Sequence, residues 1–263
     1  MEKLQIGRTP YRVVSTWNEL TRAQLLDLLR VLYGPANQLP QPLRLLSVLS
    51  GVPLPQLLAL PAVVVTQLYA LTKWTSSEEH HLTAQLLPEV RLQRSQRYAG
   101  PKSSLKNLLF GEFIFADTYF RAWATHRSAA ALDLFVATLY RPPVPGLGPS
   151  DARWQGDRRE PFNEHRTEYF AAKLAALPDD QKLAITTWYR GCRAQLEKEF
   201  PEIFAVHEEE TTGKKEGGDW GQVLRKLSGG AFGPLEQTAR QHARTVLAEM
   251  QDLARAYQKA LKK

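Results

Sequence analysis

The stretch from Thr16 to Pro35, TWNELTRAQLLDLLRVLYGP, predicts an amphipathic helix and with it a mainly helical fold. Its apolar residues recur with the three- and four-residue spacing of one helix face: Leu25, Leu28, Leu29 and Leu32. Two capping-box spacings begin at Thr16 and at Thr21, so either threonine could begin the helix. The glycine and proline that close the stretch mark its end, because proline cannot continue a helix.

A short β-hairpin is expected between the N-terminus and this helix. Four apolar residues alternate with polar ones on either side of Gly7-Arg8-Thr9-Pro10: Leu4, Ile6, Tyr11 and Val13. Such alternation around turn-forming residues is typical of two half-buried strands.

Several short helices are expected between Pro40 and Trp74, broken by Gly51, Pro53, Pro55 and Pro61. The valines at 63–65 make a buried strand an alternative to a helix in the last of these segments. Its length and the spacing of its leucines favour a helix with a proline in the first turn. Between Trp74 and Gly100 the periodicity fades, which indicates a connection.

Longer helices are expected in the second half of the chain. Ser128 can cap a helix with the inner face Leu132, Phe135, Val136, Leu139 and Tyr140. The stretch 105–123 before it is rich in phenylalanine. Two further helices are predicted, one over 163–176 and one from Asp179 or Asp180 toward Glu199. The prolines, glycines and charges of 142–161 indicate a long surface loop.

The predicted fold class is mainly α: a multi-helix globular body with a short N-terminal β-hairpin and a tethered C-terminal helical segment. Four segments are expected. Residues 1–100 hold the hairpin and a Leu-rich helical subdomain, and 101–206 form a second helical subdomain. The polar run HEEETTGKKEGGD at 207–219 has linker composition. The tail, 220–263, ends in a charged helix with sparse apolar positions, which is typical of a helix that docks with a partner.

Composition indicates a globular, cytoplasmic protein, since 43% of the 263 residues are apolar and 23% are charged. The single cysteine, Cys192, fits a reducing compartment, and its helical surroundings predict that it packs in the core. No stretch has the continuous apolar character of a signal peptide or a membrane span. The net charge of +7 indicates either a soluble surface or the binding of an acidic partner.

No catalytic motif, cofactor motif or metal site emerges from the sequence, so the chain is predicted not to be an enzyme. His80 and His81 are adjacent and therefore suit a solvated loop better than a metal. Glu164, His165 and Glu168 are weighed as metal ligands and assigned to a surface salt-bridge network. An active site assembled from distant residues stays open as a third reading, with the carboxylates Glu112 and Asp117 or the Glu164 cluster as its members.

A basic patch offers an alternative function, the binding of nucleic acid by an accessory protein. Basic residues could contact phosphates while an aromatic ring stacks on a base. The patch consists of Arg91, Arg94, Arg97, Tyr98, Lys102 and Lys106. A second basic surface is expected from Arg153, Arg158, Arg159 and Arg166.

Several segments together resemble a family of Bacteroidetes prophage proteins of the tail-assembly or virion structural cluster. In chain order they are TWNELT at 16–21, YAGP at 98–101 with Glu112-Phe113, LD at 132–133 with LYRP at 139–142, WYRGCR at 188–193, FPEIF at 200–204 and the segment 220–233. This resemblance implies no catalytic residues and a role in holding, templating or joining components of a phage-tail-like particle.

The expected function is therefore a non-enzymatic structural or chaperone-like role in assembly of a phage-tail-like or virion particle. Other assembly proteins are the expected partners, a second copy of the chain is a further candidate, and incorporation into the particle is open. Four apolar tail residues are predicted to dock into a groove on a partner or, with equal weight, to pack on the chain's own body: Trp220, Leu224, Leu227 and Phe232.

Overall fold

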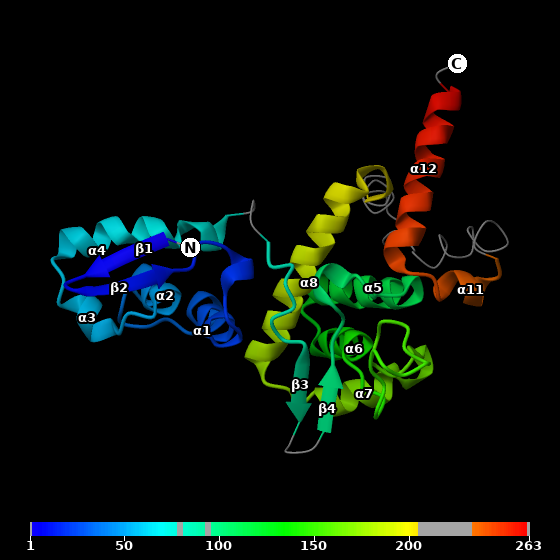
Figure 1. The fold of residues 1–263 in the computed structure, drawn as a ribbon, viewed down its shortest axis with the longest axis horizontal. Helices are drawn as coiled ribbons and strands as arrows, with labels where there is room; N and C mark the ends of the chain where they lie inside the picture. Colours follow the sequence, from blue (N-terminus) through cyan, green and yellow to red (C-terminus); the bar gives the residue numbers. More distant parts are fainter. Residues whose placement is uncertain (1, 78–80, 93–95, 205–232, 262–263) are drawn as a thin grey trace. The chain divides into compact units, whose positions relative to one another are not determined.

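A computed structural model describes residues 2–77, 81–92, 96–204 and 233–261 (Figure 1). It confirms the predicted fold class, a mainly helical chain that opens with a two-stranded antiparallel hairpin. The chain divides into two compact units. The first comprises 1–87 with 178–192, and the second comprises 88–177 with 193–263. Among the described helices, none combines the length and apolar character that crossing a membrane requires.

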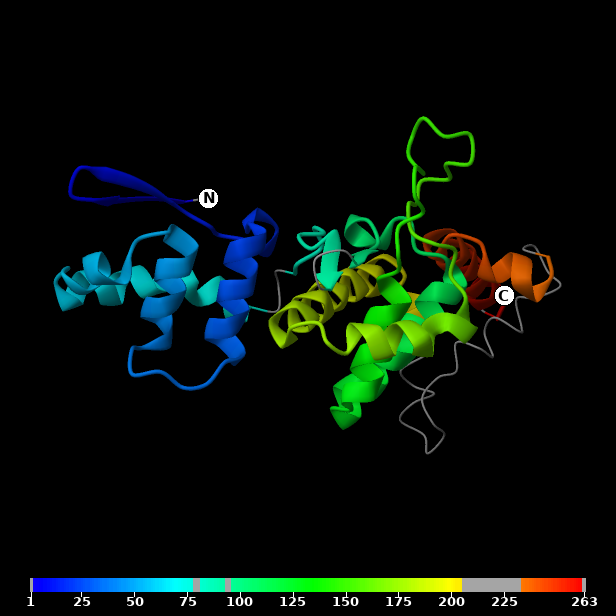
Figure 2. The ribbon, with the colours of Figure 1, turned by 90° about the horizontal axis from the view of Figure 1, so that it is seen from below.

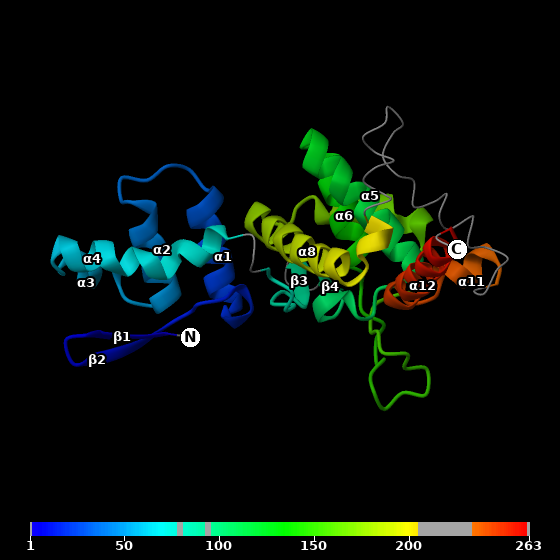
Figure 3. The same cartoon turned by 90° about the horizontal axis from the view of Figure 1, so that it is seen from above.

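The N-terminal hairpin pairs β1 (Glu2–Ile6) with β2 (Thr9–Val13). Ile6 lies opposite Thr9, so the turn consists of Gly7 and Arg8 alone, and Gly7 has the positive φ of +60° that glycine adopts most easily. Leu4, Ile6 and Tyr11 of the hairpin pack against the helical cluster of the first unit. Figure 3 shows the hairpin from above, beside the helices of that unit. The alternating apolar side chains of the hairpin therefore face a core.

The Leu-rich helix α1 (Arg22–Tyr33) begins at the second of the two candidate caps. Oγ1 of Thr21 accepts a hydrogen bond from the backbone N–H of Gln24 at 3.2 Å, and Oε1 of Gln24 accepts one from the N–H of Thr21 at 3.0 Å. Thr16 precedes only the short η1 (Trp17–Glu19) and makes no capping hydrogen bond. Leu25, Leu28 and Leu29 are buried, whereas Leu32 is half-buried.

Replacing Thr21 with alanine is expected to lower the free energy of unfolding by about 1 kcal/mol. The backbone N–H of Gln24 loses its acceptor, and the Gln24 side chain loses the hydrogen bond from the threonine hydroxyl. The matched change Thr16→Ala is expected to cost less than about 0.5 kcal/mol. Urea denaturation of both variants measures the difference. Equal losses would show that the capping box does not stabilise α1.

Prolines set the starts of the next three helices. Pro40, Pro53 and Pro61 are the N-cap residues of α2 (Gln41–Ser50), α3 (Leu54–Leu58) and α4 (Ala62–Leu68). The valines at 63–65 therefore lie in a helix, which continues as η2 (Tyr69–Ser76), and the strand alternative is wrong. Leu43, Leu46, Val52, Leu57 and Val65 form the core of this cluster.

Helix α8 (Asp179–Glu199) crosses the division of the chain, and its first part belongs to the first unit. There the indole N–H of Trp188 donates to the carbonyl oxygen of Thr83 at 3.1 Å. Oδ1 of Asn18 accepts from the backbone N–H groups of Thr83 and Ala84 at 2.8 and 2.9 Å. Cys192 is fully buried, which confirms its predicted core position.

A second hairpin, absent from the sequence predictions, begins the second unit. β3 (Glu89–Leu92) pairs with β4 (Gln96–Ala99) in antiparallel register. Its β4 strand is bonded on the other side to Arg141 through Ala99, at 2.8 and 3.1 Å. The N-terminal segment of the first unit ends at Leu87, whereas the sequence suggests a boundary near Gly100–Pro101.

The helices of the second unit pack around an aromatic core. They are α5 (Phe110–His126), α6 (Ala129–Leu139), α7 (Thr167–Leu174), α11 (Leu235–Ala239) and α12 (Ala243–Leu261). Oγ of Ser128 accepts from the N–H of Ala131 at 3.3 Å, as predicted for the cap of α6. Phe110, Phe113 and Phe135 are fully buried between these helices.

Candidate functional site

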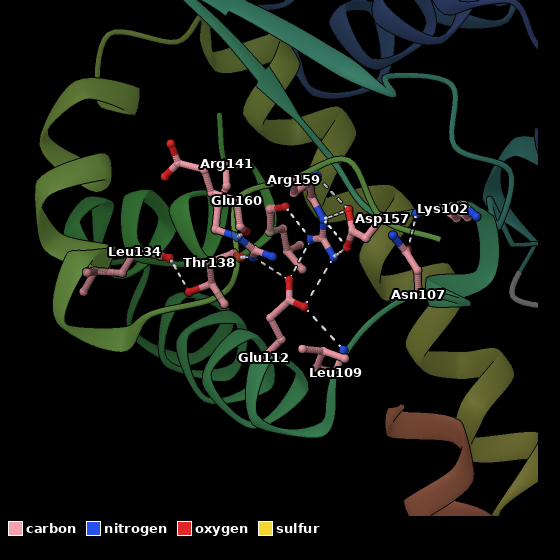
Figure 4. A network of polar contacts seen from close by, with 11 residues as sticks. Lys102, Asn107, Leu109, Glu112, Leu134, Thr138, Arg141, Asp157, Arg159 and Glu160 are labelled. Atoms are coloured by element: carbon pink, nitrogen blue, oxygen red, sulfur yellow. Dashed lines mark hydrogen bonds and ion pairs between the residues drawn. The ribbon is translucent and has the colours of Figure 1, made fainter. Parts of the chain in front are cut away.

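The second unit holds a buried network of charged side chains, drawn in Figure 4. Glu112 lies in the first turn of α5, Arg141 follows α6, and Asp157 and Arg159 lie in the loop 142–161. The side chains of Glu112 and Arg159 are fully buried, and that of Arg141 is 5% exposed. Two guanidinium groups thus meet two carboxylates in surroundings where an unpaired charge would be costly.

Glu112 is the centre of this network. Its Oε1 accepts hydrogen bonds from Nη1 of Arg141 at 2.5 Å and from Nη1 of Arg159 at 2.6 Å. Its Oε2 accepts from Nη2 of Arg159 and from the backbone N–H of Leu109, both at 3.3 Å. Both carboxylate oxygens accept hydrogen bonds from N–H donors, so Glu112 links the two arginines to the start of α5.

Asp157 and Arg159 form the outer part of the network. Nη2 and Nε of Arg159 donate to Oδ2 of Asp157 at 2.6 and 2.9 Å. Burial opposes a charge on Asp157, but the hydrogen bonds and positive charge of Arg159 outweigh it and lower the pKa of Asp157. Ionised Asp157 therefore stabilises the fold above the ordinary aspartate pKa, and this contribution disappears as the pH falls through the lowered value.

The network bonds the base of the loop 142–161 to α5 and α6. The N–H of Val144 donates to the carbonyl oxygen of Arg158, and the N–H of Glu160 to that of Pro142, both at 2.8 Å. Beyond this base the loop projects from its unit, as Figure 2 shows. A long loop on a rigid base is a common place for binding residues.

One of the four arginines predicted to form a basic surface at 153–166 is not on the surface. Arg159 is only 3% exposed and serves the buried network, so it cannot belong to a surface. Arg153 and Arg166 are exposed but paired, with Asp151 at 2.7 Å and with Glu160 at 2.8 Å. The sequence could not separate buried from exposed arginines here, because the loop has no apolar periodicity.

The other candidate carboxylates, Asp117, Glu164 and Glu168, do not belong to the network around Glu112. Asp117 is fully buried on α5, and its Oδ1 accepts from Nε of Arg193 at 2.7 Å. Glu164 lies in the short η4 (Glu164–Arg166) and Glu168 in α7, and both are exposed. In the part of the chain that the structure describes, no three histidine, cysteine or acidic side chains are grouped to hold a metal ion.

The structure divides the basic patch of 91–106. Arg91 and Arg97 lie at 3.2 and 4.0 Å from the carboxylate of Glu89, and Arg158 from the loop joins them at 3.5 Å. Lys102 and Lys106 are exposed, and Lys102 lies 5.8 Å from the ring centroid of Trp154. Tyr98 is only 3% exposed, with its ring against Phe170, so it does not present a face for stacking.

Helix α12 packs near α5 at one end and exposes apolar side chains toward the other, where Arg255 is paired with Glu202 at 3.0 Å. The N–H of Ala243 donates to the carbonyl oxygen of Leu108 at 2.9 Å, and Val246 and Leu247 are fully buried. Further along, Leu253 and Tyr257 are 53% and 67% exposed. Figure 1 shows this second half of α12 extending away from α5.

A groove of about 1160 Å³ lies beside α11, between it, α5 and residues 160–166. Its apolar lining includes Ile114, Phe115, Phe162 and Leu235. Gly111 lets α11 approach α5, because a Cβ atom there would lie 3.2 Å from Cβ of Ala239. The groove and the exposed apolar residues of α12 are two apolar features of the described part of the second unit.

Comparison with protein-family models, curated proteins and solved structures finds no match to this chain. Function is therefore inferred from the side chains themselves.

Some predicted site residues lie outside the described part of the chain. They are the tail residues Trp220, Leu224, Leu227 and Phe232, the linker 207–219 and Arg94 of the basic patch. The sequence predictions omit Leu253 and Tyr257, although their spacing from Val246 continues one helix face. They also omit Tyr169 and Lys173. The sequence of α7 is that of an ordinary amphipathic helix, so nothing in it indicates a binding role for these two residues.

Proposed function

We propose that this chain is a non-enzymatic assembly protein that binds another protein through the exposed apolar side chains in the second half of α12. The observation that supports this most directly is the exposure along one apolar stripe. The stripe follows three- and four-residue steps: Val246, Met250, Leu253 and Tyr257. Val246 is buried and Met250 is half-buried, whereas Leu253 and Tyr257 are exposed.

A stripe of this kind matches the surface that one helix offers to another. Side chains with this spacing pack into the groove of a partner helix or bundle, and the polar residues between them stay in water. Single exposed apolar residues are common on protein surfaces. Leu253 and Tyr257 differ from scattered ones in that they continue the stripe of the buried Val246 at helical spacing. The partner chemistry that fits is an amphipathic helix.

The particle in which such a partner occurs is proposed from the sequence resemblance alone. The resembling family belongs to tail-assembly or virion structural proteins, so the proposed partner is another component of a phage-tail-like particle. The proposed role is structural or chaperone-like, because the proposed surface consists of apolar side chains suited to holding another helix.

The double substitution Leu253→Glu/Tyr257→Glu tests this proposal. It should lower partner binding more than about tenfold, because charging two central apolar contacts removes the interactions that dominate such interfaces. Ala248→Glu/Ala256→Glu is the matched control, since both alanines are exposed and lie on the polar face of the same helix. Purification of each variant from the native host after nuclease treatment, with quantitative mass spectrometry, measures the bound proteins.

Loss of a stoichiometric partner from the first variant, with retention in the control, supports the proposal. Light scattering of the purified chain over a range of concentrations reveals whether that partner is a second copy. A set of bound proteins that is the same for wild type and Leu253→Glu/Tyr257→Glu would contradict it.

A further inference from the structure

We propose that the face formed by β3, β4 and α7 in the second unit binds single-stranded nucleic acid. The site differs from the predicted basic patch in its members. It consists of Arg91, Arg97, Arg158, Tyr169 and Lys173, so three of its residues come from outside 91–106.

The first support is an excess of positive charge around one carboxylate. Glu89 is shared by three arginines, Arg91 at 3.2 Å, Arg158 at 3.5 Å and Arg97 at 4.0 Å. The arginine side chains are 62%, 44% and 58% exposed, whereas that of Glu89 is 18% exposed. One carboxylate cannot neutralise three guanidinium groups, so this surface attracts anions.

The second support is a concave surface next to this cluster. A pocket of about 440 Å³ is lined by Arg97 from β4 and by Arg166 and Lys173 from the η4–α7 segment. Tyr98, Phe170 and two prolines form its apolar walls. Arg166 is held by Glu160 at 2.8 Å, which leaves Arg97 and Lys173 as the cations best placed for a ligand.

The third support is an exposed aromatic ring beside Lys173. Tyr169 lines the pocket and is 55% exposed, with Nζ of Lys173 at 4.4 Å from its ring centroid. Its edge-to-face contact with Phe170, with centroids 5.4 Å apart, steadies the ring. Tyr169 therefore offers the stacking surface that the buried Tyr98 does not.

Cations beside an exposed aromatic ring match single-stranded nucleic acid better than a duplex or an inorganic anion. Phosphates contact the arginines and the lysine, while an unpaired base stacks on the ring. In a duplex the bases already stack on each other, so Tyr169 would add nothing to its binding. The predicted affinity falls steeply with salt because binding releases counterions.

The experiment measures fluorescence anisotropy of a labelled oligothymidylate of about 20 nucleotides, a length that spans several binding sites of this kind. The full chain is titrated between about 50 and 200 mM salt, and a duplex of equal length is measured alongside. Arg97→Gln/Lys173→Gln should weaken binding about tenfold or more and reduce the salt slope by about 1.4, for two lost phosphate contacts. Lys3→Gln/Arg12→Gln is the matched control, because it removes the same two charges from exposed positions of the other hairpin.

A second pair of variants separates stacking from charge. Tyr169→Ala should weaken single-strand binding about fivefold or more, whereas Tyr169→Phe keeps the ring and should bind like wild type. Absence of binding at low salt overturns the proposal. Equal losses in the two double variants also overturn it, as does a duplex bound as tightly as the single strand with no effect of Tyr169→Ala. An acidic protein that binds this face would give the first of these results.

Discussion

Replacing Glu112 with glutamine is expected to lower the free energy of unfolding by about 3–5 kcal/mol, the usual cost of removing one partner from a buried ion pair. The amide has nearly the shape of the carboxylate but no charge. Arg141 and Arg159 would then remain buried, with Asp157 as the remaining carboxylate of the network. Oε1 of Glu112 now accepts from both guanidinium groups, and an amide nitrogen in either position would turn a donor toward a donor.

Chemical denaturation at neutral pH measures this effect. Glu168→Gln is the matched control, because Glu168 is exposed on α7 and its replacement should cost less than about 0.5 kcal/mol. The base of the long loop depends on the same network, so proteolysis within 144–158 should also become faster in Glu112→Gln. A loss below about 1 kcal/mol would mean that the arginines find water or other partners, and that the network does not stabilise the second unit.

Replacing Gly191 with alanine is expected to destabilise the first unit by about 1–3 kcal/mol, although alanine is the better helix former. A Cβ atom on Gly191 would lie 2.3 Å from the carbonyl oxygen of Leu82 and 2.9 Å from its backbone nitrogen. The backbone at 82–84 cannot easily move away. Asn18 holds the N–H groups of Thr83 and Ala84, and Trp188 holds the carbonyl oxygen of Thr83.

Thermal unfolding of Gly191→Ala and of the control Gly148→Ala tests this close approach. A Cβ atom on Gly148 would have no other heavy atom within 4 Å, so that variant should melt like wild type. An unchanged or raised melting temperature of Gly191→Ala would show that the segment at Leu82 does not lie against α8 so closely. The helix propensity of alanine would then decide the outcome.

The helices are the part of the fold that could be predicted best. Thr21, Ser128 and the prolines at 40, 53 and 61 act on their own neighbours, so short sequence windows contain their effect. The strands β3 and β4 escaped prediction because each has only four residues. Their alternation, with Val90 and Leu92 buried beside the exposed Arg91, is too short to stand out from a loop.

The candidate sites could be predicted only in part. The residue types are informative, since charge alone makes Arg91, Arg97 and Glu112 candidates. Their surroundings cannot be predicted: the sequence leaves Glu112 open as a catalytic group, and the structure pairs it with two arginines. A single sequence gives no indication that Tyr98 faces inward while Tyr169 faces outward.

The sequence by itself determined where helices begin and end, because capping, proline breaks and the 3.6-residue period are interactions between residues at most a few turns apart. Only the tertiary structure decided which charges are paired. Glu112 meets Arg141 and Arg159 across 29 and 47 residues, and Arg158 reaches Glu89 from the far end of the chain's long loop. The physical reason is that burial and ion pairing depend on which faces of distant elements pack together, and that choice is made by the whole core.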